Sequence, residues 1–329
     1  MKNILPTENI INQSIVGRFT ALLSRKRLAH AYLFVGPAGV GKRETAQYLA
    51  QVVHCEKNQD ASPASSCGQC SSCRRVASGN HPDALVIDSG EDESIKIVKV
   101  RELIHRTQLR PYEGRKKIFI IHDVEKMTLE GSNALLKTLE EPTTDTLMIL
   151  TTSSPENVLA TVKSRCHAIY FPPASHHQLV SLLVQKYQLP PESSHVIGFF
   201  AQGCLGRALN LYQTKFLERK NEIIDQLILR KDSENYLKAV LSDKEKIPEV
   251  LTVLLYWFRD LLLLKQNVED VYLAHMDRMA DLKKLVSQYS FAQLNTIIET
   301  VMNTFRLLEE NLNTKIALTL LREKIWVRS

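Results

Sequence analysis

The sequence predicts an α/β fold, a doubly wound parallel sheet with a phosphate-binding loop, followed by an all-α C-terminal half. Two observations predict the first part. An apolar stretch runs into a glycine-rich turn that ends in lysine, and further apolar stretches alternate with helical patterns up to residue 171. A third observation predicts the second part, because the chain after Pro172-Pro173 shows only helical periodicity.

The glycine-rich turn covers residues 36–42 and follows the predicted strand 30–35. Gly36, Gly39 and Gly41 let backbone N–H groups converge on phosphate oxygens, and the next helix points the positive end of its dipole at the same anion. Lys42 would reach the outer phosphates. A plain glycine-rich connector is the alternative, but the strand before the turn and the helix after it favour a phosphate loop.

The residue after the lysine departs from the full motif. Arg43 stands where a serine or threonine hydroxyl would hold Mg²⁺. Nucleotide binding and hydrolysis are therefore separate questions for this chain.

Four more apolar stretches follow the loop, and they lack polar alternation. They cover residues 84–88, 117–123, 146–152 and 168–171, and helical patterns over about 94–107, 132–140 and 156–163 separate the last four strands. Continuous apolar runs of this length are typical of parallel strands that are buried on both faces.

Four cysteines lie in the insertion at residues 55–73, three of them in its Ser/Gly-rich part, residues 65–73: Cys55, Cys67, Cys70 and Cys73. Two Cys-x-x-Cys steps that share Cys70, with one distant partner, suit a tetrahedral structural zinc ion. A disulfide pair and free thiols are the alternatives. We favour Zn²⁺ because a cytoplasmic chain keeps its thiols reduced, and four protein ligands leave no open position for catalysis.

Composition narrows the class of protein. The 329 residues carry a net charge of +6 that is spread along the chain, so nucleic-acid binding is permitted but not required. No apolar run approaches the ~20 residues of a membrane helix. The first residues also lack the pattern of a secretory signal, so we expect a cytoplasmic protein with no membrane partner.

Two further positions are candidates for phosphate chemistry. A P-loop ATPase carries two adjacent carboxylates after a neighbouring strand, but here the pair is His122-Asp123. Asp123 can also be read as a helix cap. Arg165, in Ser164-Arg165-Cys166, can project into a neighbouring subunit's nucleotide site, and the alternative for it is a surface ion pair.

Several of these features together resemble the bacterial clamp-loader ATPases of DNA polymerase III, which are AAA+ proteins. The resemblance covers about the first 210 residues and rests on residues 30–34 before the loop, the four-cysteine insertion, residues 133–142 (NALLKTLEEP) and Ser164-Arg165-Cys166. Arg43, His122 and Gly206, which stands at the motor's sensor arginine, favour the delta-prime branch over the gamma/tau motor branch. Residues 256–262 and 311–315 also resemble delta-prime collar segments.

The resemblance implies a domain plan: an AAA+ core at 1–172 with the zinc-binding insertion at 55–73, a helical lid at 173–212, and a helical collar for oligomerisation at 213–329. It implies a hetero-pentamer with delta and gamma/tau that opens the sliding clamp on primed DNA. No long extension of the tau kind is expected after the collar.

The resemblance also assigns residue roles. Arg165 would act in trans as the arginine finger of a neighbouring ATPase subunit, and Thr152 falls at the sensor-1 position. The degenerate nucleotide site would consist of Gly36, Gly39, Gly41, Lys42, Asp123 and Thr152. Binding of ATP or ADP there is left open, and hydrolysis is expected to be weak or absent. The alternatives are a catalytically active gamma/tau-like ATPase and, with less support, a helicase-like AAA+ repair module.

Overall fold

The computed structural model describes residues 12–58, 65–90, 92–113, 116–229, 236, 239–240, 243 and 246–309. Its contacts divide the chain into two compact units. The first comprises residues up to 174 together with 204–207, and the second comprises 175–203 together with the chain from 208 onward. No helix among the described residues is long and apolar enough to cross a membrane.

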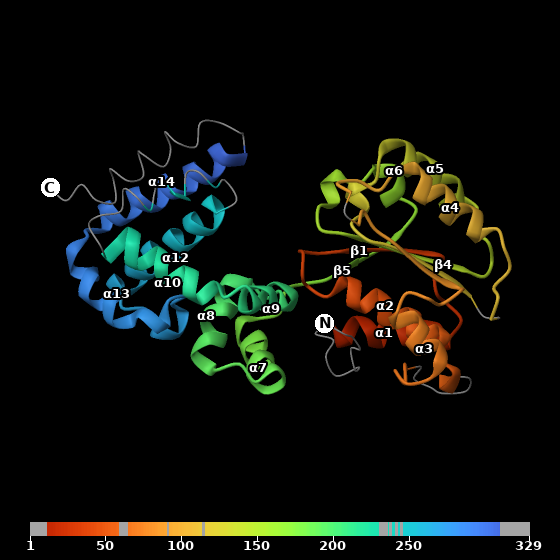
Figure 1. Ribbon diagram of the computed structural model, residues 1–329, viewed down its shortest axis with the longest axis horizontal. Coiled ribbons are helices and arrows are strands. Elements are labelled where there is room, and N and C mark those ends of the chain that lie inside the picture. Colours follow the sequence, from red (N-terminus) through yellow and green to blue (C-terminus); the bar gives the residue numbers. More distant parts are fainter. Residues whose placement is uncertain are drawn as a thin grey trace. The chain divides into compact units, whose positions relative to one another are not determined.

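A five-stranded parallel sheet forms the centre of the described part of the first unit (Figure 1). The strands are β1 (Ala31–Val35), β2 (Ala84–Ile87), β3 (Lys117–Ile121), β4 (Thr146–Thr152) and β5 (His167–Tyr170), in the order β2-β3-β4-β1-β5. Every predicted strand is present, and the predicted α/β fold with a parallel sheet is confirmed. β3 ends two residues earlier than predicted because Asp123 takes a left-handed backbone conformation with φ 53°.

Helices cover both faces of this sheet (Figure 1). One face packs against α1 (Gln13–Ser24) and α2 (Lys42–His54), with Phe19 and Leu49 in its core. The other packs against α4 (Ile97–Thr107), α5 (Leu129–Glu140) and the short α6 (Ala160–Lys163). Because both faces are covered, β1, β3 and β4 are buried along their whole length.

The helix predicted over 156–163 is divided. A 3-10 turn at Pro155–Asn157 comes first, and α6 begins only at Ala160. Val158 takes an extended backbone between them and is buried in the core on this face of the sheet. Tertiary packing of this one side chain therefore overrides the helical pattern.

The second unit is helical throughout its described residues. Its elements include α7 (His176–Tyr187), α8 (Pro191–Ala201), α9 (Leu205–Gln213, which begins in the first unit), α10 (Phe216–Ile224), a π-helical turn (Asp225–Leu229), α12 (Ile247–Lys265), α13 (Met279–Leu285) and α14 (Phe291–Glu309). The apolar faces of α12 and α14 both contribute to one core, which includes Trp257. The collar-like segment 311–315 lies outside the described residues.

Candidate metal centre and phosphate loop

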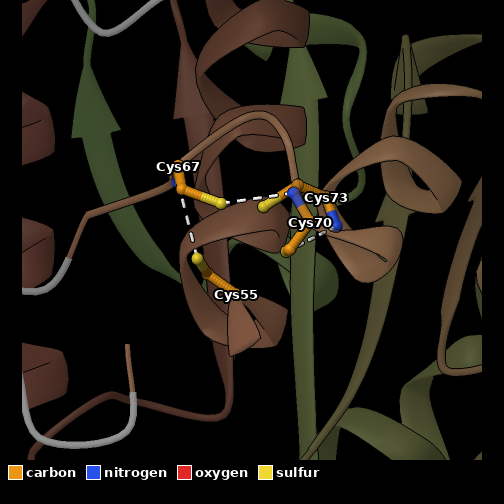
Figure 2. A group of neighbouring side chains, drawn as sticks. All are labelled: Cys55, Cys67, Cys70 and Cys73. Carbon is orange, nitrogen blue, oxygen red and sulfur yellow. Dashed lines mark hydrogen bonds between the residues drawn. The ribbon is translucent and has the colours of Figure 1, made fainter. Parts of the chain in front are cut away.

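The four cysteines of the insertion converge at the C-terminal end of α2 (Figure 2). Cys55 directly follows α2, and Cys67 and Cys70 lie in the loop that leads into α3 (Ser71–Ala77), which carries Cys73. The four Sγ atoms all lie within 4.8 Å of one another. Tetrahedral zinc with Zn–S bonds of ~2.3 Å requires S···S separations of about 3.8 Å, so small shifts bring the four sulfurs onto one ion.

Backbone N–H groups point at three of these sulfurs. Cys67 N donates to Cys55 Sγ (3.4 Å), Cys70 N to Cys67 Sγ (3.3 Å) and Cys73 N to Cys70 Sγ (3.4 Å), as Figure 2 shows. Such donors would stabilise the negative charge of sulfur ligands bound to a metal ion. These four cysteines can therefore hold a metal ion such as zinc.

Hydrogen bonds from neighbouring residues hold the insertion against α2. Gln51 on α2 donates to Cys73 O (3.2 Å), and Glu56 accepts from Ser71 Oγ (2.7 Å) and Ser72 N (3.1 Å) at the start of α3. The contact that Glu56 makes is a helix cap supplied from outside the helix. The sequence pattern indicates the four ligands but none of these supporting residues.

The phosphate loop lies at the opposite, N-terminal end of α2. Its Gly39 and Gly41 have φ of 77° and 101°, which side chains rarely tolerate. Gly36 is needed for a different reason, since a Cβ there would lie 2.5 Å from the backbone oxygen of Phe171. All three predicted glycines are thus required by the backbone path of the loop itself.

Lys42 does not point away from the loop toward a ligand. Its Nζ donates to the backbone oxygens of Gly36 (2.5 Å) and Pro37 (2.9 Å), and the residue is almost fully buried. Burial lowers the pKa of Lys42, while Asp123 and Glu125 act in the opposite direction. The ammonium group that would meet the outer phosphates is already satisfied by carbonyl groups of its own loop.

The position that should hold Mg²⁺ carries an ion pair instead. Arg43 Nη2 contacts the carboxylate of Asp88, which follows β2. His122, which replaces the first carboxylate after β3, is buried beside Thr151. Burial, reinforced by the positive charge of Arg43, lowers the pKa of His122 to about 3, so this imidazole is neutral at physiological pH. A cation and a neutral ring therefore stand where two metal-directed oxygens are needed.

The remaining nucleotide-site residues lie at the carboxyl ends of β3 and β4. Asp123 N donates to Thr151 Oγ1 (3.2 Å), so the backbone of Asp123 is anchored to β4. Thr152 is fully buried, and its backbone oxygen accepts from Gly36 N (3.2 Å) at the start of the loop. Glu125 accepts two hydrogen bonds from Ser153, which lower its pKa although desolvation acts in the opposite direction. Glu125 is not among the predicted site residues.

The segment Cys204–Arg207 belongs to the same unit as the loop and packs directly on it. Gly206 N donates to Gly39 O (2.9 Å), and a Cβ on Gly39 would lie 2.8 Å from Arg207 N. Glycine at 206 permits this backbone-to-backbone approach, since a Cβ there would already lie 3.0 Å from Gly39 Cα. The glycine that the sequence pattern singles out at 206 is thus also a packing requirement.

Arg165 lies after α6, just before the edge strand β5. Its Nε donates to Glu140 Oε1 (2.8 Å) and its Nη2 contacts the same oxygen, while Nη1 donates to Thr161 O (2.9 Å) and Ser164 Oγ (3.2 Å). The side chain of Arg165 is 33% exposed. The surface ion pair that the sequence leaves as an alternative is therefore formed within this chain, and Glu140 is a partner that the sequence does not reveal.

Two family models match this chain. The model for the DNA polymerase III delta subunit matches residues 11–175, and the model for the C-terminal part of that subunit matches residues 214–322. The first match covers the described parallel sheet and the phosphate loop, and the second includes α12 and α14.

Individual relatives point in the same direction. DNA polymerase III subunit delta' of Pseudomonas aeruginosa is 38% identical over 45% of this chain and 44% of its own length. The delta' subunit of Bacillus subtilis is 28% identical over 89% of both chains. Subunit tau of Escherichia coli is 32% identical over 63% of this chain and 32% of tau. The match therefore spans less than half of the first and third of these relatives.

Because the delta-subunit model covers half of the chain and the delta' subunit of B. subtilis aligns along most of it, the chain belongs to the DNA polymerase III delta-subunit family, among its delta' members, and is related to the gamma/tau subunits.

Proposed function

We propose that this chain acts in DNA replication as the delta' subunit of the DNA polymerase III clamp loader. In this role it assembles with delta and gamma/tau subunits and helps load the sliding clamp onto primed DNA in the cytoplasm. It supplies Arg165 to a neighbouring subunit's ATP site and hydrolyses little or no ATP itself. Family membership supports the assembly, and the geometry of the phosphate loop supports the division of labour.

The observation that carries the lack of turnover is the Arg43–Asp88 ion pair beside the buried, neutral His122. A Mg²⁺ ion in such a loop would neutralise the negative charge that develops on the phosphate. Arg43 offers no oxygen to such an ion, and its positive charge repels it. The loop retains its shape through Lys42 and Gly206, so it serves as a scaffold that joins β1, α2 and the segment 204–207.

Nucleotide binding without turnover would require Lys42 to exchange two backbone carbonyls for phosphate oxygens. Titration calorimetry of the isolated protein with ATP·Mg²⁺ and with ADP, followed by a turnover assay on the same sample, tests this part. We expect no appreciable hydrolysis. Steady turnover at the rate of a gamma/tau subunit would contradict the proposal. It would favour the alternative of an active motor-type ATPase, for which the similarity to subunit tau is the supporting observation.

Arg165 is the group through which this chain would take part in ATP chemistry. Its planar, permanently charged fork suits the oxygens of a transferring phosphate. Arg165→Ala should lower the ATPase turnover of the reconstituted clamp loader in the presence of clamp and primed DNA, with assembly unchanged by gel filtration. Unchanged turnover in a fully assembled complex would contradict the finger assignment.

The cysteine cluster is proposed to hold one structural Zn²⁺. Its four sulfurs are protein ligands, so no coordination position remains for a substrate. The ion would fix the insertion against the end of α2 and take no part in ATP chemistry. Metal analysis of protein purified under reducing conditions should give about one zinc per chain.

A further inference from the structure

The Arg165 guanidinium is held along two edges by partners of different strength. The Nε and Nη2 edge faces one carboxylate oxygen of Glu140, the last residue of α5. The Nη1 end faces two neutral acceptors, the backbone oxygen of Thr161 and the hydroxyl of Ser164. Both sets of bonds come from a charged donor, but only the Glu140 edge adds attraction between opposite charges, so that edge is the more firmly held one.

From this asymmetry we infer that Glu140 is a positioning residue for the Arg165 finger. This inference rests on the proposed function. A phosphate that approaches Arg165 can replace the weak acceptors at Nη1, while Glu140 keeps the opposite edge of the fork in place. The planar guanidinium then meets the phosphate in one fixed orientation, with most of the ordering cost of this long side chain already met in the free subunit.

The placement of the two residues fits this role. Glu140 and Arg165 lie 25 residues apart and on different elements, so their contact fixes the loop after α6 to the end of α5. The side chain of Glu140 is 49% exposed, and its carboxylate completes no buried network. A Gln replacement therefore removes the charge without opening a cavity or stranding a buried partner.

The test uses the reconstituted clamp loader with clamp and primed DNA. Glu140→Gln should lower kcat about 10-fold, a smaller loss than Arg165→Ala causes, because misorientation by about 1 Å costs up to 10²-fold whereas loss of the finger costs more. KM for ATP should change little, since the finger acts on the transferring phosphate. Glu141→Gln, the same change at the next exposed residue, should match the unmodified complex.

A double variant separates positioning from a general effect on the fold. Glu140→Gln should have no further effect in the Arg165→Ala background, and neither change should alter the thermal midpoint of the isolated chain by more than a degree or two. If Arg165→Ala lowers turnover but Glu140→Gln does not, the positioning role is overturned while the finger remains. If Glu140→Gln acts equally in both backgrounds, it works independently of Arg165 and the inference is likewise overturned. If neither single change lowers turnover, the finger assignment itself fails.

Discussion

The two ends of α2 carry the two predicted ligand sites, and these sites differ in completeness. At the C-terminal end of α2, every group that a structural metal requires is present, and four sulfurs lie within 4.8 Å of one another. At its N-terminal end the glycine loop is formed, but Lys42 is bound to the loop's own carbonyls and Arg43 is paired with Asp88.

This difference shows that the shape of a ligand site and its capacity for catalysis are separate properties. The cysteine insertion needs only geometry, and its four ligands are all present. Hydrolysis at a phosphate loop needs both the loop geometry and a bound metal ion, and Arg43 and His122 offer no metal-directed oxygen for such an ion. A loop of this shape is therefore evidence for the fold, whereas the residues around its lysine decide the chemistry.

The largest expected effect is at the cysteine cluster, at the C-terminal end of α2. Cys70→Ser should release the metal and lower the free energy of unfolding by several kcal/mol, because structural zinc contributes about 10–16 kcal/mol in small zinc-binding peptides. Metal analysis measures the release of zinc, and the thermal midpoint measures the loss of stability, each with and without a chelator. Cys166→Ser is the matched control, since Cys166 lies outside the cluster. Equal zinc content in the two variants would refute the proposed centre.

The next largest effect is a pH dependence of stability caused by His122, beside the phosphate loop. The pKa of His122 is lowered to about 3 in the folded chain, against 6.5 as its ordinary value. As the pH falls, His122 is therefore protonated first in the unfolded chain, and this favours unfolding. The stability that depends on a neutral His122 is complete above pH 6.5 and is lost as the pH falls toward 3. The total is a few kcal/mol, at about 1.4 kcal/mol for each unit of pKa.

Denaturant unfolding of the unmodified chain and of His122→Asn between pH 7 and 4 measures this contribution. The stability of the variant should fall less steeply with acidification. Parallel curves for the two proteins would mean that His122 is not kept neutral by its burial.

A smaller effect, a gain in affinity for ATP·Mg²⁺, is expected when metal-directed oxygens are introduced at residues 43 and 122. The double change Arg43→Ser with His122→Asp should tighten binding of ATP·Mg²⁺ about tenfold, or ~1.4 kcal/mol, and the gain should vanish without Mg²⁺. Calorimetric titration is the measurement, and Arg101→Asp, on an exposed position of α4, changes the net charge by the same amount and is the charge-matched control. No gain would show that the self-contacts of Lys42, rather than the lost oxygens, close the loop.

The smallest effect tests the contact between the loop and residue 206. Gly206→Ala should destabilise the chain by about 1 kcal/mol because its Cβ would crowd Gly39, and this outweighs the better helix propensity of alanine. Gly17→Ala, in α1 with nothing within 4 Å of the added Cβ, should instead stabilise by up to about 1 kcal/mol. Urea unfolding compares the two, and an equal gain at both positions would mean that the Gly39–Gly206 approach is not tight.

Much of the fold follows from local patterns. The five strands are apolar runs bounded by helical periodicity, and the spacing of the four cysteines is enough to predict that they cluster. Failures occur where distant residues meet. Arg43 and Asp88 are 45 residues apart, and Glu140 and Arg165 are 25 apart, so no local pattern links either pair.

The prediction for Lys42 shows a different limit. The motif indicates which residue reaches the phosphates when they are bound, but it does not show what that residue contacts otherwise. Only the folded loop reveals that two of its own carbonyls lie within reach of Nζ. Sequence motifs describe the liganded geometry of a site, and the alternative contacts depend on the path of the backbone.

The bonds from Lys42 to Gly36 and Pro37 have a consequence for the cell. A loop that satisfies its own ammonium group does not need an anion to stay folded, so we expect its shape to be the same at high and low adenylate energy charge. In the proposed assembly with gamma/tau subunits, we therefore expect this subunit to keep one conformation. Movement in the assembly would then originate in the members that respond to the energy state of the cell.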